Sequence, residues 1–167
     1  MRGVEIGRAD LIKTLSELPT DYYLDVDLLF KEREILEELS GSFATFFASE
    51  AYKLIIEGAP LEYQTTWDIL ESTSEMSARK LWCDLVKVSL KKYNRVNVPF
   101  LMMQGSHDHC TDTAIALKWF NNLEASFGKK CVMFDRSAHW LQIEENDKFA
   151  FILTTWCLAL EARPPTK

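Results

Sequence analysis

The chain has 167 residues, of which 47% are hydrophobic and 26% are charged. That length suits one domain, or one domain with a small appendage, that buries roughly 70% of the surface of its unfolded chain. The composition excludes a collagen, a solenoid tail and a wholly disordered protein. The net charge of −6 argues against nucleic acid as a partner, because phosphate-binding surfaces need clustered Lys and Arg.

The sequence predicts a soluble, cytoplasmic protein without a membrane partner. No apolar run approaches the roughly 20 residues that span a bilayer, and residues 1–10 lack the apolar core of a signal peptide. The four cysteines are far apart and form no C-x-x-C pair, so reduced thiols are expected. The tightest group with metal-ligand chemistry is His107 to Cys110, whose adjacent side chains do not converge easily on one ion. We therefore expect no bound metal.

Residues 1–95 are predicted to be all-helical. Two short helical patterns cover residues 11–18 and 26–39, and Thr20 or Asp21 is expected to cap the second. Two further patterns repeat apolar side chains at steps of three and four residues, as an amphipathic helix does. These side chains are Phe43, Phe46, Phe47, Ala51, Leu54 and Ile55, followed by Ala78, Leu81, Trp82, Leu85 and Val88.

From residue 96 to residue 167 the pattern alternates between strand and helix. Short apolar runs predict buried strands, and apolar stripes at helical spacing predict the helices between and after them. The predicted strands cover 98–104 and 131–134, and the predicted helices cover 113–127, stopped by Gly128, and 149–160. Glu144 and Glu145 are expected to complement the positive N-terminus of the last helix. Alternation of this kind predicts an α/β fold with parallel strands and helical crossovers.

Acid-base side chains follow both predicted strands. Asp108 comes soon after the first strand, and His139 comes soon after the second. The carboxyl ends of parallel strands meet at one edge of a sheet, where α/β proteins bind their ligands, so we expect the two side chains to lie close together. A carboxylate in this position holds an imidazole in one tautomer and stabilises its cation.

Three stretches of sequence resemble the closing third of an α/β-hydrolase. They are VPFLMMQGSHD at 98–108, FDRSAH at 134–139 and EENDKF at 144–149. More narrowly, they are similar to the proline iminopeptidase (prolyl aminopeptidase) branch. The stretches LSGSF at 39–43, PLEY at 60–63 and residues 77–93 resemble the helical cap of that branch. The resemblance implies a helical cap at 1–95 and a C-terminal part of the hydrolase core, with about two parallel strands, at 96–167.

The resemblance also implies roles for individual side chains. It assigns Asp108 as the triad acid and His139 as the triad base. Trp140 either lines the mouth of the pocket or merely packs. A cap carboxylate such as Glu57 or Glu62 would bind the free α-amine of a substrate, although a solvated acidic helix face is the alternative. No G-x-S-x-G nucleophile elbow occurs in the sequence, so the chain supplies the acid and the histidine but not the serine.

Two functions from different classes follow. The first is a capped serine hydrolase that acts on an amide or ester, such as an N-terminal proline peptide, by acyl transfer without a cofactor. Its substrate would be a small molecule or a peptide, and this chain alone is expected to be inactive. The alternative is a non-catalytic hydrolase fragment that serves as an interaction or oligomerisation module. In both cases a second chain or copy is expected to cover the exposed edge of the short sheet.

Overall fold

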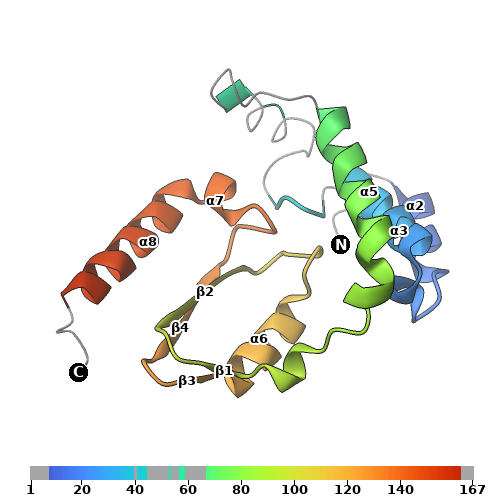
Figure 1. The fold of residues 1–167 in the computed structure, drawn as a ribbon. Helices are drawn as coiled ribbons and strands as arrows, with labels where there is room; N and C mark the ends of the chain where they lie inside the picture. The colour runs from blue at the N-terminus through green and yellow to red at the C-terminus, as the bar shows by residue number, and fades with distance from the viewer. Residues whose placement is uncertain (1–7, 40, 45–52, 54–56, 59–66, 163–167) are drawn as a thin grey trace.

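The computed structural model describes residues 8–39, 41–44, 53, 57–58 and 67–162 (Figure 1). The helices of the first part gather on one side of the molecule, beside the part that carries the strands. They are α2 (Ala9–Ser16), the 3-10 helix η1 (Tyr22–Leu24), α3 (Val26–Glu38) and α5 (Trp67–Leu85), and a further 3-10 helix, η3 (Leu90–Lys92), follows α5 before the strands. These bear out the helical patterns predicted at 11–18, 26–39 and 78–88, whereas most of the pattern from Phe43 to Ile55 lies outside the described residues.

The start of α3 differs from the expected one. Asp25 caps the helix, because its carboxylate accepts hydrogen bonds from the backbone N–H of Asp27 at 2.8 Å and of Leu28 at 3.3 Å. The prediction of a cap at Thr20 or Asp21 was wrong. Asp21 instead precedes the short helix η1, to which its side chain makes no capping bond. The turn of η1 thus separates the Pro19 breaker from the true helix start.

Polar contacts hold α5 against the beginning of the chain. Arg79 forms an ion pair with Asp27 of α3, and its guanidinium lies 5.4 Å from the ring centroid of Phe30. The indole N–H of Trp82 donates to the backbone carbonyl of Leu24 at 3.2 Å. These contacts join segments that are more than 50 residues apart, so α5 packs against η1 and α3.

Two short parallel pairs of strands form among the described residues. The strands are β1 (Arg95–Val96), β2 (Phe100–Gly105), β3 (Glu124–Ala125) and β4 (Lys129–Phe134). β1 pairs with β3, and β2 pairs with β4 in a register that runs from Phe100 opposite Lys129 to Gly105 opposite Phe134. The predicted parallel strands and the α/β class are therefore confirmed, and the pair β1 and β3 was not predicted.

The crossover helix between β2 and β4 is shorter than expected. Asp112 caps the start of α6 (Thr113–Asn122) by accepting from the N–H of Ile115 at 2.9 Å. At the other end, the ammonium of Lys129 donates to three carbonyl oxygens of the last helical turn and its exit, at 2.6 to 2.9 Å. This cation stabilises the helix C-terminus and leaves the following residues to form β3.

The last two helices are α7 (Leu141–Glu144) and α8 (Asn146–Glu161). The apolar stripe predicted a helix at 149–160, and that helix is present. However, none of the residues of α8 is buried, and Phe151 is 71% exposed. A pair of short strands offers a long apolar helix too little surface to cover it, so α8 keeps an uncovered apolar face.

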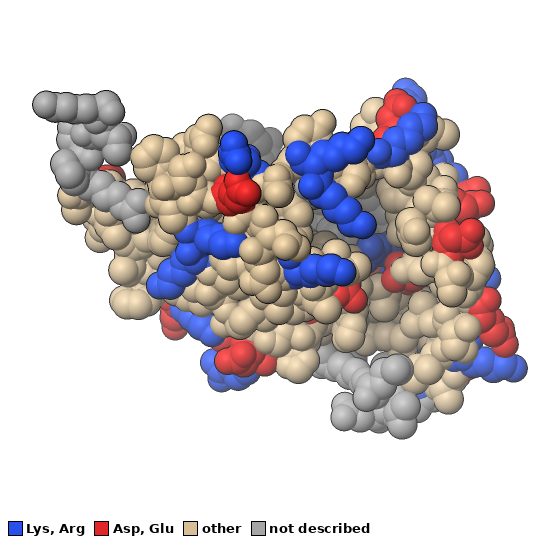
Figure 2. Space-filling view, turned by 90° about the horizontal axis from the view of Figure 1, so that it is seen from below, with Lys and Arg blue, Asp and Glu red and all other residues tan. Residues whose placement is uncertain are grey.

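Charge is distributed unevenly over the surface. Seen from below, basic side chains lie across the middle of the molecule, whereas most acidic side chains in view line the end formed by α2, α3 and α5 (Figure 2).

Among the described residues, none of the helices combines the length and the apolar character needed to cross a bilayer.

Candidate active site

The loops that follow β2 and β4 lie in close contact at the carboxyl ends of the strands. Only glycine fits at position 105, because a Cβ there would lie 2.6 Å from the carbonyl oxygen of Ser137 and closer still to that of Ala138. The N–H of His107 donates to the same Ser137 carbonyl at 3.0 Å. Gly105 therefore sets the distance between the loop of Asp108 and the loop of His139.

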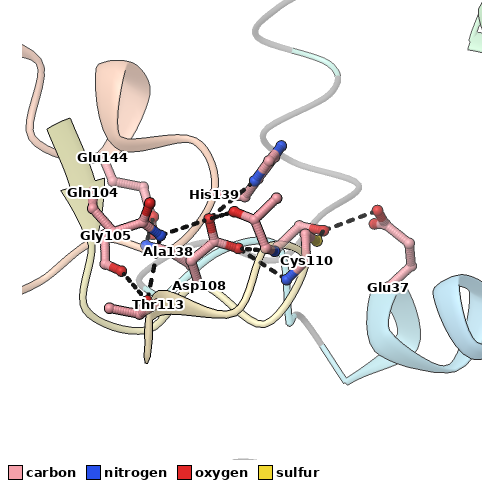
Figure 3. Close-up of polar contacts among 11 residues, drawn as sticks. Glu37, Gln104, Gly105, Asp108, Cys110, Thr113, Ala138, His139 and Glu144 are labelled. Carbon is pink, nitrogen blue, oxygen red and sulfur yellow. Dashed lines mark hydrogen bonds and ion pairs between the residues drawn. The ribbon is translucent and has the colours of Figure 1, made fainter. Parts of the chain in front are cut away.

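The Asp108 carboxylate is buried and accepts hydrogen bonds from five donors (Figure 3). Oδ1 accepts from the backbone N–H of Cys110 at 2.9 Å and of Thr111 at 2.8 Å. Oδ2 accepts from the Thr111 hydroxyl at 2.5 Å, from the Gln104 amide at 3.2 Å and from Nδ1 of His139 at 3.1 Å. Four of the five donors come from residues within four positions of Asp108, so the local chain fixes this carboxylate.

The same contacts decide the charge of Asp108. Burial alone would raise its pKa, but the hydrogen bonds from His139 and Thr111 and the attraction to His139 outweigh it and lower the pKa from 3.8 to about 2. Asp108 is therefore an anion throughout the neutral pH range. An ionised acceptor at Nδ1 favours the imidazole tautomer that carries its proton on Nδ1.

His139 lies where the positions after the two strands predicted it, next to Asp108. Its side chain is 41% exposed, in contrast to the buried carboxylate. Since Nδ1 faces Asp108, the ring directs Nε2 away from the carboxylate. The structure thus brings together the acid and the histidine of the predicted pair, with one ring nitrogen held and the other directed outward.

A pocket of about 350 Å³ opens beside His139. Both parts of the chain line it, with side chains from α3 and the segment after it on one side and from the two loops on the other. The lining residues are Arg33, Glu37, Ser42, Cys110, Thr111, His139 and Trp140. The Ser42 hydroxyl donates to Glu37 at 3.0 Å and lies 3.1 Å from the sulfur of Cys110. Burial raises the pKa of the Cys110 thiol, although the Ser42 contact and Arg33 oppose the shift.

The predicted substrate-binding residues have different outcomes. Trp140 lines the pocket and also packs: its ring stacks on that of Phe43, with centroids 6.0 Å apart and an interplanar angle of 7°. It meets the His139 ring edge to face at 6.1 Å. Glu57 is exposed and lies 3.7 Å from the ammonium of Lys53. Glu62 lies outside the described residues.

Two glutamates accept hydrogen bonds from the loop that carries His139, residues 135–140, which we call the histidine loop. The sequence did not reveal this role of the two glutamates. The Glu145 carboxylate accepts from the N–H of Arg136 at 3.1 Å and from the Ser137 hydroxyl at 2.7 Å. Glu144 accepts from the N–H of Ala138 at 2.7 Å and of Ala44 at 2.6 Å. The sequence predicts that Glu144 and Glu145 complement the N-terminus of the last helix. Glu145 is the N-cap of α8, but its side chain makes no capping hydrogen bond and instead lies 3.6 Å from the ammonium of Lys148 in the first turn. The sequence signal for these contacts is the adjacent acidic pair, Glu144 and Glu145, five and six residues after His139.

Asp108, Cys110 and His139 also form a group with metal-ligand chemistry. One ligand atom from each lies within 4.8 Å of the others. This set differs from the stretch His107 to Cys110, because His107 instead contacts the Asp135 carbonyl at 3.0 Å and His109 is exposed. The donors around Asp108 already occupy both of its oxygens, so an ion bound here would have to replace the Asp108 to His139 hydrogen bond.

No protein-family model, curated protein or solved structure matches this chain. The resemblance of its motifs to α/β-hydrolases thus stays a prediction from the sequence. What the structure adds is the geometry of the acid, the histidine and the pocket beside them.

Proposed function

We propose that this chain supplies the acid and the histidine of a serine-hydrolase active site that acts on an amide or ester. The observation that carries the proposal is the 3.1 Å contact between Asp108 Oδ2 and His139 Nδ1 at the carboxyl ends of two paired parallel strands. The pocket of about 350 Å³ next to His139 is large enough for a small acyl group or the end of a peptide.

The roles follow from the geometry. Asp108, anionic and fixed by its loop, holds the His139 ring and stabilises the imidazolium that forms. Nε2 of His139 accepts the proton of a serine hydroxyl as that oxygen attacks the carbonyl, and then donates the proton to the leaving group. The serine is supplied from outside this sequence, which has no nucleophile elbow.

An N-terminal proline peptide is the substrate class that the sequence resemblance suggests. Such a substrate carries a charged secondary amine close to the scissile bond. The pocket offers the carboxylate of Glu37, placed on α3 opposite the histidine loop, as a partner for that amine. The expected partner Glu62 stays a prediction.

Two observations favour the alternative of an interaction module. One apolar face of α8 is uncovered, with Phe151 71% and Leu158 60% exposed. In addition, β2 and β4 each pair on one side only within the described part of the chain. Exposed strand edges and apolar helix faces are the features through which chains associate. This second function is compatible with the first, since the partner could be the one that carries the serine.

The three histidines allow a direct test of the acid and histidine pair. The assay is the release of p-nitrophenol from the activated ester p-nitrophenyl acetate by the chain alone, measured against pH. An imidazole attacks this ester directly, so the assay reports on His139 and Asp108 without the serine that the complete site needs. We expect His139→Ala to remove most of the protein-dependent rate and Asp108→Asn to lower it severalfold, whereas His107→Ala and His109→Ala keep it. Equal losses in all three histidine variants would contradict the proposal. A fluorophosphonate probe, which labels activated serines, tests whether the nucleophilic serine comes from another chain. If the probe labels a serine of this chain in the wild type but not in His139→Ala, the nucleophile lies within these 167 residues.

A further inference from the structure

The carboxylate of Glu144 joins two distant segments of the chain. Glu144 is the last residue of α7, and its two oxygens accept from different backbone N–H groups. Oε1 accepts from Ala44 at 2.6 Å, in the segment that follows α3. Oε2 accepts from Ala138 at 2.7 Å, the residue that directly precedes His139. One side chain therefore bridges the helical part and the histidine loop.

A second contact joins the same two segments. The N–H of His139 donates to the carbonyl oxygen of Ser42 at 3.0 Å. Between Ser42 and Ala44, Phe43 is 1% exposed and stacks on Trp140. The backbone of His139 is thus held by Ser42 directly and by Glu144 through Ala138, while its side chain is held by Asp108.

We infer that Glu144 is a positioning residue that makes the placement of His139 depend on the docking of the segment 41–44. Short bonds from backbone N–H groups to an ionised carboxylate are among the stronger hydrogen bonds in proteins. When a ligand or a partner moves the segment 41–44, the bonds from Ala44 to Glu144 and from His139 to Ser42 break together. Movement of the helical part is thereby transmitted to the histidine, whether or not the proposed hydrolysis takes place.

Glu145 provides a matched control within the same turn. Its carboxylate also accepts two hydrogen bonds, but both donors, Arg136 and Ser137, belong to the histidine loop itself. Glu145→Gln loosens the loop without removing a bond to the helical part. Glu144→Gln places an amide where two backbone donors need an acceptor, so one of the two bonds is lost. Comparison of the two variants separates coupling between segments from general support of the loop.

The experiment is amide hydrogen exchange by NMR on the full chain, as wild type, Glu144→Gln and Glu145→Gln. We expect Glu144→Gln to accelerate exchange at Ala44, Ala138 and His139 by about 10- to 100-fold. Glu145→Gln should accelerate exchange at Arg136 and leave Ala44 at the wild-type rate. The side-chain nitrogen spectrum of His139 gives a second readout, because loss of the Asp108 contact in Glu144→Gln mixes the two tautomers.

Two results would overturn the inference. One is an unchanged exchange rate at Ala44 and His139 in Glu144→Gln. The other is the same acceleration at both positions in Glu145→Gln. If Glu144→Gln does not fold, Glu144→Asp keeps the charge and shortens the side chain by one methylene, so that it reaches only one of the two donors. Unchanged rates at both Ala44 and Ala138 in that variant would equally overturn the inference.

Discussion

The two loops of the candidate site are held in different ways. Asp108 is fixed by its own neighbourhood, with four donors from residues 104–111. His139 is fixed by contacts from far along the chain, with Ser42 on its backbone and Glu144 beside it bonded to Ala44. The acid therefore keeps its geometry wherever the strand and its loop fold, whereas the histidine needs the helical part in place.

The largest loss of stability should come from a substitution at Gly105, where the two loops meet. Gly105→Ala places a methyl group against the carbonyl oxygens of Ser137 and Ala138, which are backbone atoms and cannot rotate away. We expect the free energy of unfolding to fall by about 3 kcal/mol or more, measured by urea denaturation. Gly58→Ala is the control, because no atom of the described residues lies within 4 Å of a Cβ at that position. Equal stability of Gly105→Ala and wild type would show that the loops can separate freely.

A smaller effect should follow from neutralising the acid. In Asp108→Asn the amide N–H₂ replaces one acceptor oxygen and faces donors from Gln104, Thr111 or His139, so we expect a loss of about 2 kcal/mol at pH 7. The pH dependence has a definite sign. Because the pKa of Asp108 falls from 3.8 to about 2 on folding, its stabilisation is complete above pH 3.8 and disappears as the pH falls toward 2.

The measurement for Asp108 is the free energy of unfolding of wild type and Asp108→Asn from pH 6 to pH 2. We expect the difference between them to shrink by about 2 kcal/mol between pH 4 and pH 2, because 1.36 kcal/mol corresponds to one pKa unit. A difference that stays constant over this range would mean that the carboxylate has an ordinary pKa in the folded protein.

The contrast between the two loops also explains what the sequence could predict. The strands, the crossover helix and the position of Asp108 follow from local patterns of apolar residues and from a glycine turn. The closeness of His139 to Asp108 follows from one further rule, that parallel strands end at the same edge of a sheet. These features depend on neighbours in the sequence or on topology.

Other features of the site depend on side chains that meet only in the fold. The bridge made by Glu144 joins residues about 100 positions apart, and the stack of Phe43 on Trp140 joins two loops. No periodicity marks such contacts. The pair β1 and β3 was missed for another reason, since a two-residue strand carries no alternation to detect. The cap at Asp25 was missed because the 3-10 turn of η1 delays the start of α3.

The stack of Trp140 on Phe43 is the apolar part of the contact that holds the histidine loop. Trp140→Ala removes this stack, and we expect the unfolding free energy to fall by about 1 to 2 kcal/mol. Trp140→Phe keeps a ring against Phe43 and should lose less than half as much. Thermal unfolding followed by circular dichroism measures both variants. If Trp140→Phe and Trp140→Ala are equally destabilised, the stack with Phe43 contributes little to the position of the loop.

The smallest effect on the free energy of unfolding should come from the uncovered face of α8, where Phe151 and Leu158 are largely exposed. Because Phe151 and Leu158 are 71% and 60% exposed, the double variant Phe151→Ser and Leu158→Ser should change the unfolding free energy by less than about 0.5 kcal/mol.

The effect of this double variant on association with another chain or copy should be larger, since the two side chains form the uncovered face of α8. Sedimentation velocity at several concentrations compares the variant with wild type. A self-associating wild type and a monomeric variant would assign α8 to an interface between copies. A wild type that is monomeric at every concentration leaves α8 free for the chain that carries the serine, because self-association would not compete for that surface.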